Sequence, residues 1–123
     1  GNEKDYSPTQ NQIKMGRLAV DSGADLVLGH HSHRMNPIEL YKGKYICYSL
    51  GNFSFAGNAK PEDMDTYIFQ QRFRVYPDGT AENADMRGAY AVSGRGGIAH
   101  EPAVDKPRRR GGKQMKTYGE EDL

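Results

Sequence analysis

The stretch Ala24-Asp25-Leu26-Val27-Leu28-Gly29-His30-His31-Ser32-His33 decides how this sequence folds and where its chemistry lies. Its first part is a short run of leucine and valine between a helical pattern and a glycine, which predicts a buried and parallel strand. The strand should end at Gly29, so three histidines follow its carboxyl end. Ligands of open α/β sheets bind beyond the carboxyl ends of the strands. The sequence therefore predicts a functional site in this loop.

The loop holds three of the four histidines of the chain, namely His30, His31 and His33. Neutral imidazole is the commonest metal ligand among side chains, and two histidines separated by one residue can both face one centre. We therefore predict that these three residues form a metal or phosphate site, with all three as metal-ligand candidates, and that Gly29 lets the backbone turn sharply and a ligand come close. The alternative is a polar loop without a special role. The pattern does not separate zinc from manganese or iron.

A helix is predicted upstream of the strand, over residues 8–22. Ser7 is the expected N-cap, Pro8 suits the first helical position, and Gln10 completes a capping box. Gly23 supplies the left-handed stop. The buried face should contain Ile13, Gly16 and Val20.

Downstream, the pattern predicts a hairpin with strands at 37–41 and 44–48, followed by a Gly-Asn bend at 49–53. Glu39 alternates with Ile38 and Leu40, so it should face solvent. Cys47 lies on an alternating strand and is expected to be a small buried hydrophobe rather than a nucleophile.

A second hairpin is predicted after a loop at 57–65, with a strand at 66–76, a turn at 77–79 and a return strand at 80–87. Aromatic and apolar residues of the first strand share one face, which should be buried: Tyr67, Phe69, Phe73 and Val75.

The chain of 123 residues is long enough for one domain or a piece of one. We assign residues 1–91 to a domain and expect 92–123, which is basic and glycine-rich, to be an irregular or disordered tail. The net charge is +1, from 17 basic and 16 acidic residues, which argues against a nucleic-acid binder. The sequence has no apolar run of the length that crosses a bilayer.

Three stretches, at 24–33, 37–44 and 48–53, together resemble the CapA-type family of poly-γ-glutamate capsule biosynthesis, and the strand at 66–76 resembles it more weakly. That family is similar in fold to the calcineurin-like metallophosphoesterases. The resemblance implies an α/β fold, a partial metallophosphatase-like sandwich in which one N-terminal helix precedes mostly β hairpins. Residues 1–91 would be the C-terminal part of such a domain.

The resemblance also suggests roles for single residues. His31 and His33 match the His-x-His of the family, with His30 beside them, and Ser32 stands where relatives often carry proline. Gly1-Asn2-Glu3 resembles the end of a His-Trp-Gly-x-Glu segment, which makes Glu3 a catalytic candidate together with His31; the alternative is a solvated terminus. Asn52 is a candidate for substrate binding, and its alternative is a structural turn.

The other ligand motifs of the family would lie upstream of Gly1. We therefore expect an incomplete site for one or two divalent metal ions, of Mn, Fe or Zn, and the upstream part of the domain as the partner that completes it. This implies a metal-dependent phosphatase-like activity in the longer protein and little activity of this chain alone. An anionic polymer or a phosphoester is the expected substrate, at a bacterial cell surface or membrane. The alternative is a non-catalytic binding or assembly module for an anionic polymer.

Overall fold

The computed structural model describes residues 1–53, 62–92 and 117–118, with one helix and six strands in these ranges. It confirms the predicted α/β class with an N-terminal helix and mostly strands. In chain order the elements are α1 (Gln10–Asp21), β1 (Leu26–Leu28), β2 (Ile38–Tyr41), β3 (Lys44–Cys47), β4 (Asp65–Val75), β5 (Ala81–Val92) and β6 (Thr117–Tyr118).

Helix α1 begins two residues later than the sequence indicated. Its N-cap is Thr9, whose hydroxyl oxygen accepts a hydrogen bond from the Gln12 backbone N–H at 3.3 Å, while the Gln12 side chain accepts one from the Thr9 N–H at 2.9 Å. The prediction of Ser7 and Gln10 as the capping box is wrong because this second pair has the same spacing and satisfies the first turn. Gly23 has φ +103°, which confirms the left-handed stop.

The larger sheet has the strand order β1-β3-β2-β6. Strand β1 is parallel to β3, as predicted, and β2 and β3 form the predicted antiparallel hairpin around Lys42 and Gly43. Leu28 is 51% exposed, so the predicted burial of its strand is wrong there, because β1 lies at the edge of this sheet.

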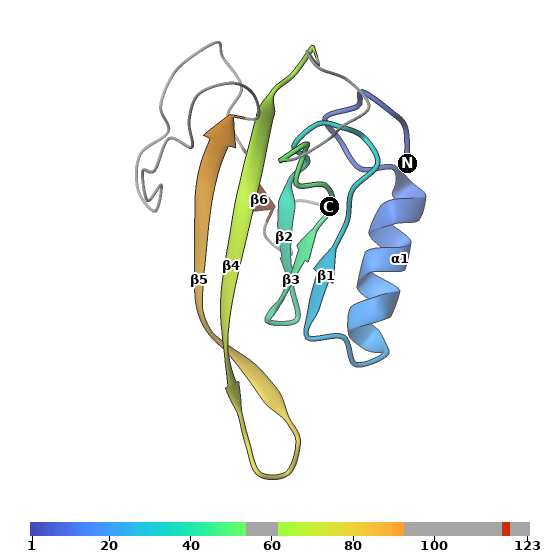
Figure 1. Ribbon diagram of the computed structural model, residues 1–123. Helices are drawn as coiled ribbons and strands as arrows, with labels where there is room; N and C mark the ends of the chain where they lie inside the picture. Colours follow the sequence, from blue (N-terminus) through green and yellow to red (C-terminus); the bar gives the residue numbers. More distant parts are fainter. Residues whose placement is uncertain (54–61, 93–116, 119–123) are drawn as a thin grey trace.

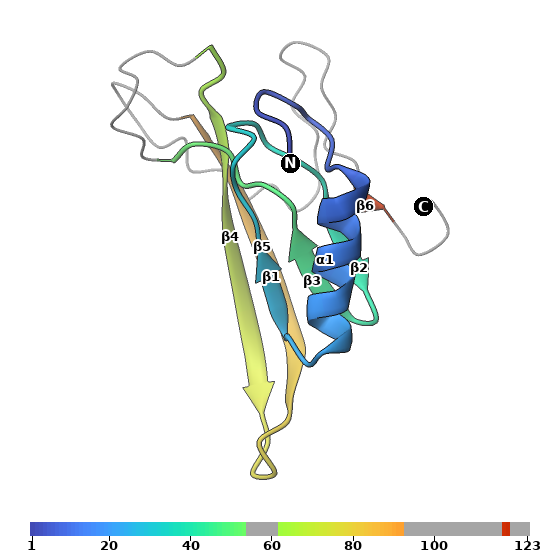
Figure 2. The same cartoon turned by 90° about the vertical axis from the view of Figure 1, so that its right-hand side faces the viewer.

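Both faces of this sheet are covered in its centre. Helix α1 packs on one face and the β4–β5 hairpin lies on the other (Figures 1 and 2). The helix side contains the small core cluster Ile13, Val20, Ile46 and Tyr48. A ring contact of 5.8 Å between the centroids of Tyr45 and Phe69 joins the two sheets. Cys47 is fully buried, as predicted.

Glu39 is buried, with 1% of its surface exposed, so its predicted orientation toward solvent is wrong. It pairs in register with Ile46 and points to the face that α1 covers. Period-two alternation separates buried from wet positions only where one face of a sheet meets water, and this hairpin has cover on both sides.

The β4–β5 hairpin confirms the second predicted hairpin, and β5 runs on to Val92. Its turn end reaches beyond the rest of the molecule (Figure 1). Of the predicted buried stripe, Tyr67, Phe69 and Phe73 are half-buried, whereas Val75, next to the turn, is 69% exposed.

Most of the expected irregular tail lies outside the described residues, as does most of the loop predicted at 57–65. Within the tail, Thr117–Tyr118 forms β6, which pairs in parallel with β2. The sequence pattern did not predict this short strand.

Candidate functional site

The histidine loop, residues 29–36, leaves the carboxyl end of β1. It lies beside the segment that precedes α1 and the segment that enters β4 (Figures 1 and 2). Gly29 continues the ladder, since its N–H donates to the Cys47 carbonyl at 2.7 Å. A Cβ on Gly29 would lie 2.3 Å from the Tyr48 carbonyl oxygen. The glycine therefore allows close backbone packing, and the sharp turn expected at Gly29 falls instead on His31 and His33, with φ of 89° and 56°.

His33 meets Asn52 of the Gly-Asn bend. The His33 Nδ1 and the Asn52 Oδ1 are 2.9 Å apart. An amide oxygen only accepts hydrogen bonds, so the neutral imidazole carries its proton on Nδ1 and its lone pair on Nε2. A histidine ligand is usually oriented by such a hydrogen bond from its other ring nitrogen.

Asn52 is positioned by the backbone on both sides of it. Leu50 forms a bridge with Met35 of the histidine loop, and Gly51 forms one with Thr66 of β4. Gly51 has φ +77°, and a Cβ there would lie 2.6 Å from the Asp65 carbonyl oxygen. The bend is therefore held between the histidine loop and β4, which fixes where the Asn52 side chain points.

His30 and His31 are exposed, whereas His33 is half-buried. Within residues 1–53, 62–92 and 117–118, no three His, Cys, Asp or Glu side chains are grouped so that they could hold a metal ion. The structure thus brings His33 to Asn52 but does not gather the three histidines into one cluster. Their predicted role as metal ligands stays a prediction.

The segment that contains Glu3 crosses the histidine loop. The Lys4 N–H donates to the Ser32 carbonyl at 2.7 Å, and the Asn36 side chain donates to the Asp5 carbonyl at 2.9 Å. Glu3 itself is exposed and lies one residue before the first of these bonds. Its predicted catalytic role is untested, but the backbone places it at the edge of the loop.

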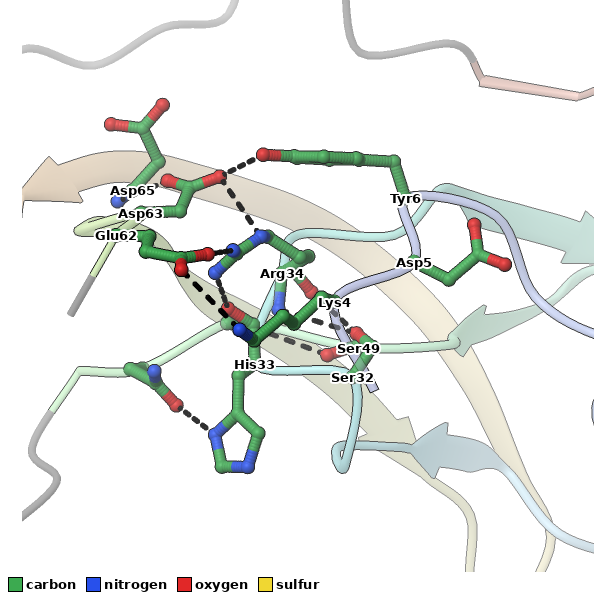
Figure 3. A network of polar contacts seen from close by, with 12 residues as sticks. Lys4, Asp5, Tyr6, Ser32, His33, Arg34, Ser49, Glu62, Asp63 and Asp65 are labelled. Atoms are coloured by element: carbon green, nitrogen blue, oxygen red, sulfur yellow. Dashed lines mark hydrogen bonds and ion pairs between the residues drawn. The ribbon is translucent and has the colours of Figure 1, made fainter. Parts of the chain in front are cut away.

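Sequence reasoning missed Arg34, which is 6% exposed and lies at the centre of a polar network (Figure 3). Its guanidinium pairs with Glu62 at 3.0 Å and with Asp63 at 3.7 Å. Arginine is rarely buried without such partners. The only sequence signal for a role of Arg34 was its place directly after His33. Its partners Glu62 and Asp63 lie in a segment predicted as loop, so no pattern linked them to Arg34.

Cys47 lies behind the site in the core of the sheet. Burial raises the pKa of its thiol from the ordinary value of 9.0 to about 12. The thiol is therefore protonated at neutral pH, which agrees with the prediction that Cys47 is a packing residue and not a nucleophile.

Comparison with known families defines the class of this part of the chain. Residues 1–56 match the family model described as the bacterial capsule synthesis protein PGA_cap. The match includes the N-terminal segment, α1, the histidine loop and the bend at Asn52. This part of the chain is therefore similar to that family.

Similar curated proteins make the assignment more specific. The chain is 49% identical over 55 residues to the PGA biosynthesis protein CapA of Bacillus subtilis. The aligned region covers 45% of this chain and 14% of that protein. It is 44% identical over 55 residues to the capsule biosynthesis protein CapA of Bacillus anthracis, covering 45% and 13%. A probable polyglutamine synthesis accessory protein of Mycobacterium tuberculosis is 36% identical over 52 residues, covering 42% and 14%.

These matches confirm the CapA-type resemblance over residues 1–56. The chain spans less than a fifth of the length of these relatives. No solved structure matches the chain significantly. In the part of the chain that the structure describes, no helix is both long and apolar enough to cross a membrane.

Proposed function

We propose that this chain carries part of a metal-dependent phosphatase-like domain that serves poly-γ-glutamate capsule biosynthesis. The capsule role is taken from the names of the similar proteins, of which two are CapA proteins. The metal-dependent chemistry is an inference from the histidine loop. In this proposal the remaining ligands and most substrate contacts would come from a longer protein of the size of those relatives.

The observation that carries the proposal is the hydrogen bond between His33 and Asn52 at the carboxyl end of β1. It presents the His33 imidazole as the Nδ1–H tautomer, whose Nε2 lone pair is the form that binds a metal ion. The left-handed φ of His33 also requires contacts that hold it in place.

In this proposal His33 and His31 are ligands and His30 can replace either of them. Divalent metal ions, of Mn, Fe or Zn, would act as Lewis acids toward a phosphoryl or carbonyl oxygen when bound. Asn52 has its Oδ1 directed at His33, and its Nδ2 would donate to an oxygen of the substrate. Glu3, at the edge of the loop, would exchange protons with the reacting groups together with His31.

The experiment uses the full-length protein, with metal content measured by mass spectrometry and turnover measured on a generic phosphoester. Changing His31 and His33 together to alanine should remove metal and turnover. The matched control is His100→Ala, since His100 is the fourth histidine of the chain and lies apart from the loop in sequence. Unchanged metal occupancy in the double variant would refute the ligand assignment.

The same measurement separates the alternative function. A non-catalytic module for an anionic polymer would show no turnover with any added metal, while binding of poly-γ-glutamate would persist after chelation. Steady turnover that chelation abolishes would exclude the non-catalytic reading.

A further inference from the structure

Arg34 is a buried cation whose role the proposed chemistry leaves open. Its side chain is only 8% exposed, and a charge at such a position is costly unless it is paired and hydrogen-bonded. Nη2 donates to Glu62 Oε2 at 3.0 Å, and Nε lies 3.7 Å from Asp63 Oδ2. The guanidinium carbon lies 5.7 Å from the centre of the Tyr6 ring.

The partners of Arg34 also hold one another (Figure 3). The Tyr6 hydroxyl donates to Asp63 Oδ2 at 2.6 Å, and Lys4 Nζ lies 3.3 Å from Glu62 Oε1. Three segments that are far apart in sequence therefore meet around one guanidinium: the N-terminal segment, the histidine loop and the residues that lead into β4. The planar guanidinium has five N–H donors and can bind several acceptors at once. A lysine ammonium cannot bind the same acceptors in this geometry.

The network reaches the histidine loop at a backbone atom of His33. Arg34 Nη1 donates to the His33 carbonyl oxygen at 3.2 Å. The Ser32 hydroxyl donates to the Arg34 carbonyl at 2.9 Å and accepts from the Arg34 N–H at 3.3 Å. These bonds enclose a residue with φ of 56°, a conformation that a residue with a Cβ adopts only where its surroundings hold it.

We propose that Arg34 is a positioning residue, which fixes the backbone of His33 so that its ring meets Asn52 and presents Nε2. This inference rests on the proposed role of His33 as a ligand. Arg34 itself would not bind the substrate, because its charge is already shared between two carboxylates.

The test compares Arg34→Lys and Arg34→Met with the control Arg74→Met. The control removes an exposed arginine that pairs with Glu82 in the β4–β5 hairpin. Ring nitrogen chemical shifts of His33 report its tautomer without any metal. Wild type and Arg74→Met should show the Nδ1–H form. Both Arg34 variants should shift toward the Nε2–H form, and their affinity for Mn²⁺ should fall by about tenfold.

A variant that does not fold is replaced by Glu62→Gln, which removes the negative charge of one partner of Arg34 at a side chain that is 69% exposed. It should cause a smaller shift in the same direction. A folded Arg34 variant with the wild-type tautomer of His33 would overturn the proposal, even if its melting temperature had dropped. A wild-type protein with the Nδ1–H form but no affinity for Mn²⁺ would refute the metal function and leave the positioning role of Arg34 standing.

Discussion

Arg17 of α1, whose side chain is 29% exposed, and the buried Glu39 of β2, 22 residues apart in sequence, form an ion pair with two hydrogen bonds. Arg17 Nε and Nη2 both donate to Glu39 Oε1, at 2.9 and 2.7 Å. The Tyr48 hydroxyl donates to the other carboxylate oxygen. Burial raises the pKa of the Tyr48 hydroxyl, and its hydrogen bond to Glu39 raises it further. The three side chains join the helix to the hairpin that leads to Asn52.

Replacing Arg17 with methionine should destabilise the fold by about 3 kcal/mol, since it leaves the Glu39 carboxylate buried without its cation. The matched control is Arg74→Met, whose pair with Glu82 is exposed on both sides and should contribute less than about 1 kcal/mol. Urea unfolding followed by circular dichroism measures both values. Equal losses in the two variants would contradict a structural role for the buried pair.

The same pair shows how far the fold could be predicted. Helix, hairpins and the parallel pairing of β1 follow from local patterns of apolar residues and glycines, and the structure confirms them. The burial of Glu39 depends on a helix that covers the second face of the sheet, which no local pattern contains. The helix start was misplaced because two capping pairs, at Ser7 and Thr9, have the same spacing in the sequence.

For the site, the sequence indicated the histidine loop and Asn52 as candidates but not what holds the loop in shape. His33 and Asn52 follow strands of one sheet whose carboxyl ends lie together, so their contact could be anticipated. Arg34 and Glu62 come together through the path of the chain into β4. Such a pairing depends on tertiary structure, and single residues in loops give no periodic signal for it.

A substitution at Gly29 should disturb the site through the backbone. In Gly29→Ala the new Cβ would lie 2.3 Å from the Tyr48 carbonyl oxygen and 3.1 Å from that of Cys47. Backbone atoms cannot move aside as a flexible side chain can, so β1 must shift away from β3. We expect a loss of several kcal/mol and a change in the His33 and Asn52 amide resonances.

Gly43→Ala is the control for this change. Gly43 has φ +75° and no atom within 4 Å of its Cβ position, so only the cost of the left-handed conformation remains. That cost is about 1 kcal/mol. An equal effect of the two substitutions in urea unfolding, or unchanged resonances of His33 in Gly29→Ala, would argue against close packing at Gly29.

Alkaline pH should weaken the fold through Cys47. Its pKa is raised by burial from 9.0 to about 12, so the folded state keeps the proton longer than the unfolded chain does. The stabilisation is complete below pH 9.0 and is lost as the pH rises toward about 12. One such group changes the free energy of unfolding by about 1.4 kcal/mol per pH unit within that window.

Comparison with Cys47→Ala isolates this contribution from those of Tyr48 and Tyr67, whose pKa values burial also raises. The variant should be less stable at neutral pH but should lose stability less steeply above pH 9.0. Parallel curves of free energy of unfolding against pH for the two proteins would contradict the assignment. The native thiol should also resist alkylation by iodoacetamide at neutral pH.

Asn52→Leu should weaken metal binding without unfolding the protein. Leucine has a similar size but no acceptor for His33 Nδ1, so the imidazole loses the bond that fixes its tautomer. Loss of such an orienting partner lowers metal affinity by about tenfold to a hundredfold. Isothermal titration with Mn²⁺ in the full-length protein measures the change.

Two further variants decide whether the acceptor is what matters at Asn52. Asn52→Asp keeps an oxygen that accepts from Nδ1 and adds negative charge, so its affinity for Mn²⁺ should equal or exceed that of wild type. Asn11→Leu, at an exposed position of α1, should leave the affinity unchanged. If Asn52→Leu binds Mn²⁺ as wild type does, the bend is only a structural turn and His33 is not oriented through it.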